Sequence, residues 1–144
     1  MSPAPALRIR DVAGQGDEAR RASLRLVLDG LRADSAHDTE RARGLYQRAL
    51  QVDSGNPYAY LALARQSVES EEPDLALEYV DRAEDLFDAE GARTPGVDAD
   101  LDGLRGAALV LTGDADRGAA LLDLAALHAP EVWSDRRLDA DELR

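Results

Sequence analysis

The sequence predicts an all-α fold built from antiparallel helical hairpins. Three observations support this prediction: apolar residues recur at helical spacing along most of the chain, proline and glycine separate the periodic segments, and aromatic residues make up only 4% of the composition. With so few aromatic residues, contacts between elements must rely on leucine, valine and alanine, which suit closely packed helices better than a sheet. The 144 residues fit one domain.

The clearest hairpin lies between Asn56 and Ala89. Asn56 suits a helix N-cap and Pro57 suits the first helical turn, because the side chain of a cap accepts a hydrogen bond from an unpaired amide and proline has no amide to pair. Pro73 ends this helix and starts a second one. The second helix places its apolar residues on one side: Leu75, Ala76, Tyr79, Val80, Ala83 and Leu86. A single hairpin cannot bury such a face, so neighbouring hairpins are expected.

The same pattern recurs on both sides of this hairpin. Counting back 34 residues, Ala83 matches Ala49 and Val80 matches Tyr46. Counting forward requires 42 residues, because Gly91–Asp98 forms an insertion. The matched small and aromatic residues are Gly30, Ala42, Tyr46 and Ala49, then Tyr60, Leu63, Ala64, Ala76 and Ala83, then Gly106, Gly113, Gly118, Ala125 and Pro130.

This repeat of two helices resembles the tetratricopeptide repeat (TPR), over roughly residues 23–130. The resemblance implies about three hairpins stacked as a right-handed superhelix, at about 17–54, 55–90 and 97–130. The usual aromatic residue and leucine of the family are replaced by Leu26 and Asp29 in the first unit, and by Asp102 and Arg105 in the third. The register of the helix around 98–112 is therefore left open.

Cap residues place the other helix ends. A first helix is expected to open near Asp17–Glu18 and to run to about Ala33, because acidic residues suit the positive end of the helix dipole. Asp38 should cap a helix over 39–52, and Asp114 should cap the last long helix. Gly91–Gly96 is expected to form a flexible loop, since it contains proline and two glycines.

Two terminal segments flank the predicted hairpins. Residues 1–16 form an N-terminal arm, expected to be flexible, with an apolar strip at Leu7, Ile9 and Val12. This strip is either a frayed arm or an extended segment lying on the helical stack. Residues 131–144 are expected to form a capping tail, with Trp133 shielding the apolar face that the last hairpin leaves uncovered.

The resemblance also implies a binding groove, because in the family the first helix of each pair lines a concave surface that holds a peptide or helix. Lysine and asparagine clamp acidic chaperone tails in some members, and neither occurs at the matching places here. We expect instead a partner with an amphipathic helix or an apolar extended segment, whose basic flanks complement the acidic rim of the groove. The implied groove residues are Leu24, Val27, Leu31, Tyr58, Leu61, Arg65, Val68, Ala107 and Val110.

Composition restricts the other classes of function. A net charge of −12 disfavours nucleic-acid binding, and the absence of cysteine excludes disulfides and thiol catalysis. No catalytic constellation, cofactor motif or membrane-spanning segment is recognisable, so we expect a non-catalytic adaptor or scaffold without a cofactor. The alternative is an assembly protein that forms a homodimer or larger homo-oligomer through the groove or the ends of the stack. A cytoplasmic location is expected, although a removed N-terminal signal would leave a periplasmic or lipid-tethered location open.

The sequence contains one candidate metal site. Asp98, Asp100 and Asp102, followed by Gly103, resemble the start of an EF-hand calcium loop. The position that should carry a bidentate glutamate is Leu109, however, so these carboxylates are expected to form the acidic first turn of a helix and no metal site.

Overall fold

The computed structural model describes residues 5–144, and over that range it is all-α without strands. Three pairs of long helices are followed by two short ones. The elements are a 3-10 turn η1 (Ile9–Asp11) and the helices α1 (Glu18–Ser35), α2 (Thr39–Val52), α3 (Pro57–Glu69), α4 (Pro73–Glu90), α5 (Pro95–Leu111), α6 (Ala115–His128), α7 (Pro130–Trp133) and α8 (Ala140–Leu143).

The helix starts follow the caps that the sequence indicates. The side chains of Asp17, Asp38 and Asn56 each accept a hydrogen bond from a backbone amide in the first turn of α1, α2 and α3. Asp114 precedes α6, but its carboxylate makes no capping bond and instead pairs with Arg117 at 3.1 Å. The predicted bounds of α2 are confirmed, while α1 continues to Ser35, beyond the expected end near Ala33.

The loop at the insertion is shorter than expected. Gly91 adopts a left-handed conformation (φ 62°) that ends α4, and the Thr94 hydroxyl accepts a hydrogen bond from the Val97 amide at 3.2 Å. Helix α5 therefore begins at Pro95, so Pro95 and Gly96 belong to a helix and not to the predicted loop. The Thr-Pro pair is an N-cap followed by a first-turn proline, which is the signal that overrides the two glycines.

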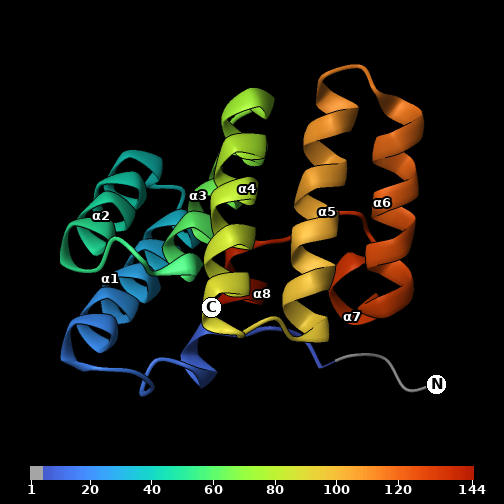
Figure 1. The fold of residues 1–144 in the computed structure, drawn as a ribbon. Helices are drawn as coiled ribbons and strands as arrows, with labels where there is room; N and C mark the ends of the chain where they lie inside the picture. Colours follow the sequence, from blue (N-terminus) through green and yellow to red (C-terminus); the bar gives the residue numbers. More distant parts are fainter. Residues whose placement is uncertain (1–4) are drawn as a thin grey trace.

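Helices that follow each other in sequence pack together, as α1 with α2, α3 with α4 and α5 with α6, and each pair contacts the next (Figure 1). Small residues lie where the helices cross: Ala49 and Ala83 are fully buried, and a Cβ atom on Gly106 would lie 2.8 Å from the Gly118 carbonyl oxygen. Helix α3 contacts both α1 and α5, so the first helices of the three pairs share one side of the layer. The predicted groove residues lie on the helices that form this side.

No helix within residues 5–144 combines the length and the apolar character that crossing a bilayer requires.

Candidate protein-binding surface

The inner face, defined here as the side formed by α1, α3 and α5, contains the nine predicted groove residues. Six of them are buried inside the chain: Leu24, Val27, Leu31, Tyr58, Leu61 and Arg65. Val68 and Ala107 are half-buried, and Val110 is 42% exposed. The predicted groove is therefore closed at these six residues, contrary to the expectation that all nine line a surface open to a partner.

The C-terminal segment, residues 131–144, provides most of the cover. It crosses from α7, which packs on α6, to α8, which packs on α1 and α3 (Figure 1). Trp133 and Leu143 are fully buried and Leu138 is nearly so. The segment does contact the last hairpin, as expected of a capping tail, because the Trp133 indole lies against Gly103 of α5. Beyond that contact it continues along the inner face to the first hairpin.

The N-terminal segment completes the cover at α1. Ile9 is fully buried, and the Arg10 amide donates a hydrogen bond to the Arg144 carbonyl oxygen at 3.1 Å. The apolar strip therefore lies on the helical stack, as in the second alternative, but Ile9–Asp11 form the 3-10 turn η1 and are not extended. Residues 1–4, also part of the predicted flexible arm, lie outside the described residues.

A polar cluster lies beneath the covering segment. The Arg65 guanidinium pairs with Asp34 at 3.4 Å and with Glu69 at 3.3 Å, and it donates a hydrogen bond to the Leu138 carbonyl oxygen at 3.4 Å. The Tyr46 hydroxyl donates a hydrogen bond to Asp34 Oδ2 at 2.6 Å, the same oxygen that pairs with Arg65. Burial and this hydrogen bond raise the pKa of Tyr46. The cluster ties the tail to α1, α2 and α3 through hydrogen bonds.

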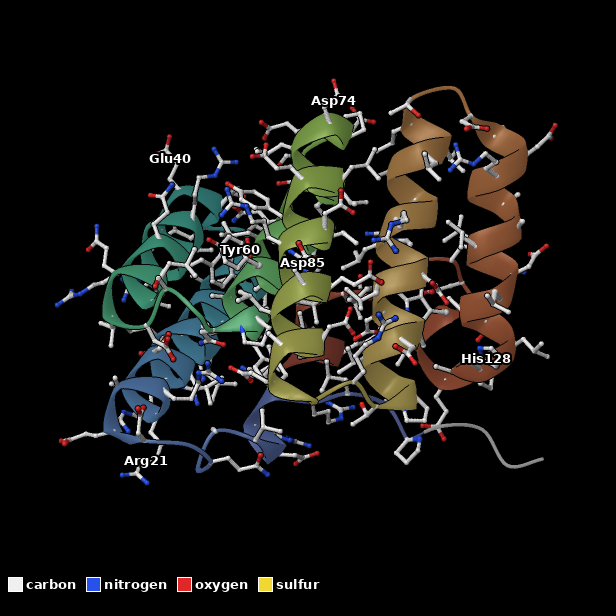
Figure 2. The ribbon with its side chains drawn as sticks, viewed as in Figure 1. Arg21, Glu40, Tyr60, Asp74, Asp85 and His128 are labelled. Atoms are coloured by element: carbon white, nitrogen blue, oxygen red, sulfur yellow. The ribbon has the colours of Figure 1, made fainter. Side chains whose placement is uncertain are left out.

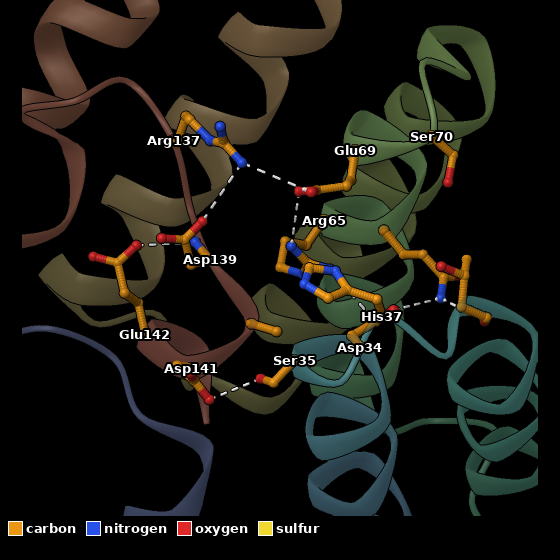
Figure 3. A pocket seen from close by; sticks show the side chains of 13 residues that line it. Asp34, Ser35, His37, Arg65, Glu69, Ser70, Arg137, Asp139, Asp141 and Glu142 are labelled. Carbon is orange, nitrogen blue, oxygen red and sulfur yellow. Dashed lines mark hydrogen bonds and ion pairs between the residues drawn. The ribbon is translucent and has the colours of Figure 1, made fainter.

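A polar pocket of about 280 Å³ opens beside this cluster, between the α1–α2 turn, α3 and the tail (Figure 3). Ser35 Oγ donates to Asp141 at 2.7 Å across its floor, and Arg137 lies 3.7 Å from both Glu69 and Asp139. Five carboxylates (Asp34, Glu69, Asp139, Asp141 and Glu142) and two arginines (Arg65 and Arg137) line it, so the arginines offset only part of the negative charge of the pocket.

Asp100 is the second polar anchor of the tail. Its Oδ1 accepts a hydrogen bond from Trp133 Nε1 at 2.9 Å, and its buried Oδ2 has no partner in the described residues. Burial raises the pKa of Asp100 to about 7, the Trp133 hydrogen bond opposes the rise, and the charge of Glu142 adds to it. A carboxyl group with such a pKa holds its proton over a wider pH range than a surface aspartate does.

Asp34 was not among the residues predicted from the sequence, and Asp100 was considered only as a candidate calcium ligand, although the repeat register places both on the inner face. Asp34 occupies the place of Val68 one unit earlier, and Asp100 occupies the place of Tyr58 one unit later. The nine predicted groove residues follow the groove positions of the family, and neither Asp34 nor Asp100 was among them. Carrying every one of these positions across all three units of the register would have included both.

The three candidate calcium ligands do not converge on one point. Asp98 pairs with Arg93 at 2.8 Å on the surface, Asp100 is buried against Trp133, and Asp102 lies half-buried on the same helix. Alternate residues of a helix project in different directions, so α5 cannot wrap them around a cation. Within residues 5–144, no three side chains of the metal-binding types come together.

The remaining part of the inner face is open. Val68, Ala107 and Val110 line a hollow of about 440 Å³, together with Leu111, Leu122, Arg136 and Arg137. Val110 and Leu111 are each 42% exposed there, at the C-terminal end of α5. Its lining carries both signs of charge, since Glu69 and Glu71 lie there with the two arginines, and Arg137 is 3.7 Å from Glu69. This surface, called the α5 hollow below, can accept an apolar side chain from another molecule.

Comparisons of the chain with protein-family models, with curated proteins and with solved structures found no match.

Proposed function

We propose that the chain is a non-catalytic protein-binding module of the tetratricopeptide type, whose stacked hairpins form a right-handed superhelix. Ala49, Ala83 and Ala125 are all fully buried and lie 34 and 42 residues apart, the second step being one period plus the insertion of eight residues, which supports the repeat. The packing of each helix pair on the next supports the stack. The buried polar groups Arg65 and Asp100 bond to the C-terminal segment, so their burial is explained by a structural role and requires no catalytic one.

The α5 hollow is the observation that carries this proposal. It is the one third of the predicted groove that the chain leaves accessible, and it combines an apolar floor with a rim of both charges. Exposed apolar groups gathered in a hollow mark interaction sites on folded proteins. The partner would insert an apolar side chain from an amphipathic helix or an extended segment over Val68 and Val110, and charged flanks would fix its orientation.

A photo-reactive side chain introduced at position 110 tests this proposal in the source cells. We expect a discrete cross-linked protein from position 110 and none from position 52, because Val52 is similarly exposed (40%) but lies on α2, away from the hollow. Ala107→Arg should abolish the cross-link by filling the floor with a charge. Cross-linking that is equal at both positions, or unaffected by Ala107→Arg, would exclude the hollow as the binding site.

The alternative is self-association through the same hollow. It predicts that the protein cross-linked from position 110 is a second copy of this chain, and that Val110→Glu abolishes the association. The mass of the cross-linked product decides between the two.

A further inference from the structure

The C-terminal segment divides the inner face into three adjoining cavities. Two of them are the polar pocket and the α5 hollow, and a small cavity of about 50 Å³ shares residues with both. Arg137 of this segment and Glu69 of α3 line all three cavities and lie 3.7 Å apart (Figure 3). Arg136 and Leu138 complete the wall of the small cavity on the side of the segment. Displacing residues 136–138 therefore joins the three cavities into one groove along α1, α3 and α5.

Residues 134–144, called the strap below, are attached by a small apolar area. The strap leaves α7 beside the end of α6, where Figure 2 marks His128, and it contacts α1 and α3 through α8, which has only four residues. Its buried apolar side chains are Leu138, Ala140 and Leu143. Helix α3, by contrast, is buried along most of its length. Because local opening begins where little apolar surface is buried, the strap can open while the three hairpins stay folded.

Two unpaired polar atoms of the interior lie where the C-terminal segment docks. Within residues 5–144, Arg65 Nε and Asp100 Oδ2 are the buried side-chain atoms that lack a hydrogen bond. Arg65 donates through Nη1 to the Leu138 carbonyl oxygen of the strap, and Asp100 accepts from Trp133, directly before the strap. A buried polar atom without a partner destabilises the closed state, whereas water supplies a partner when the cover opens. Both atoms therefore favour opening.

The strap also shows which side chains the groove accepts. Arg136 and Arg137 line the α5 hollow together with Glu69 and Glu71, and the next residue, Leu138, is buried. When the strap is displaced, Glu69 loses one of its two arginine partners. The open groove then presents negative charge beside an apolar floor, on a chain whose net charge is −12. A basic pair followed by an apolar residue complements such a groove.

We propose that the strap is an internal occupant of the groove, and that a partner segment with two adjacent basic residues followed by an apolar one displaces it. This inference rests on the proposed function, because it names the partner of the α5 hollow and what regulates access to it. The partner binds only the fraction of chains whose strap is open, so the closed strap lowers its apparent affinity. Binding in turn extends the contact from the hollow toward α1.

Binding of a fluorescent peptide with the sequence of residues 134–144 to the full chain, followed by anisotropy, tests the proposal. Ser35→Cys and Asp141→Cys replace two side chains that form a hydrogen bond of 2.7 Å, in a chain without other cysteines. A short bis-maleimide linker between them holds the strap closed, whereas capping both with N-ethylmaleimide leaves it free. We expect the capped protein to bind the peptide at least about tenfold more tightly than the linked protein. Arg136→Glu with Arg137→Glu in the peptide should abolish binding.

Two single variants test the strap without a linker. Leu138→Ser removes one of its buried apolar side chains and should increase the affinity of the chain for the peptide severalfold. Leu127→Ser is the matched control, at a leucine that is 72% exposed on α6, and should leave the affinity unchanged. Circular dichroism verifies that both variants keep their helices.

Four outcomes overturn the inference: equal binding by the linked and capped proteins, binding by neither, binding that does not depend on the arginines of the peptide, or equal effects of Leu138→Ser and Leu127→Ser. Dimerisation of the capped protein in sedimentation velocity would also overturn it, because the occupant would then be the strap of a second copy. The α5 hollow itself is tested separately, by the cross-link from position 110, so failure of the strap and failure of the proposed function are distinguishable.

Discussion

At the scale of single residues, Asp100 is the clearest example of a group whose chemistry depends on the fold. It lies on α5 at a position where the other units carry Leu24 and Tyr58, and it is buried with its carboxyl group against the Trp133 indole. Its unpaired Oδ2 faces no donor among the described residues. Ionisation of this carboxyl group therefore opposes the docking of the C-terminal segment, while the neutral acid is compatible with it.

This environment predicts a pH dependence with a defined sign. The pKa of Asp100 rises from its ordinary value of 3.8 to about 7, so between these values the folded chain keeps a proton that the unfolded chain has lost. Stability from this group is complete below the lower value and is lost as pH rises through the upper one. Asp100→Asn keeps an oxygen acceptor for Trp133 and cannot ionise. As the pH is raised from 4 to 8, the free energy of unfolding of the variant, measured in urea, should increase relative to that of the wild type by an amount on the order of a few kcal/mol.

The one charged group that shifts the pKa of Asp100 is on the tail. Glu142 raises the pKa of Asp100 from α8, and its own pKa is raised mainly by burial, so its titration adds to the same trend. Parallel stability curves for the wild type and Asp100→Asn would show that Asp100 is already ionised in the folded chain at neutral pH, contrary to our interpretation.

At the scale of elements, the helix crossings depend on residues too small to fill more space. Ala83 of α4 is fully buried at such a crossing, whereas Ala89 lies exposed near the end of the same helix. Both are alanines on one helix, so their substitution compares packing with helix propensity held constant.

We expect Ala83→Leu to destabilise the chain by roughly 1 to 3 kcal/mol, because the larger side chain forces α4 away from its neighbours. Ala89→Leu, the control, should change the free energy of unfolding by less than about 0.5 kcal/mol. Thermal and urea unfolding measure both. Equal effects at the two positions would mean that the crossing is not where the repeat register places it.

The inner face provides a second comparison between elements. Leu61 of α3 is fully buried beneath the terminal segments, while Val68, two turns later on the same helix, lies at the edge of the α5 hollow. Both were predicted from the sequence to be open to a partner. The structure instead makes Leu61 part of the core.

Leu61→Arg should therefore lower the free energy of unfolding by several kcal/mol, because it buries an unpaired charge. Val68→Glu should cost less than about 1 kcal/mol, since its carboxylate reaches water at the rim and lies near Arg137. Differential scanning calorimetry of the two single variants separates these effects. A normal melting temperature for Leu61→Arg would show that the terminal segments do not cover this part of α3 in solution.

At the scale of the whole molecule, the parts predicted from the sequence are those fixed by local chemistry. Asp17, Asp38 and Asn56 place three helix starts because a cap bonds to amides only a few residues away. The course of residues 131–144 depends on contacts such as Ser35 with Asp141 and Arg10 with Arg144, which join distant parts of the chain. Periodicity carries no information on such pairings. The sequence therefore predicts that residues 131–144 cover an apolar face, but it does not predict that this face extends to the first hairpin.

The central claim is that the chain closes its own inner face except at the α5 hollow, and thiol labelling tests it directly. The chain contains no cysteine, so Val27→Cys and Val110→Cys each introduce a single reporter, the first fully buried and the second 42% exposed. Under native conditions, Val110→Cys should react with a maleimide at nearly the rate of a free peptide thiol. Val27→Cys should react at least about a hundredfold more slowly, because labelling requires the terminal segments to open. Similar rates at the two positions, with both variants folded, would contradict the account.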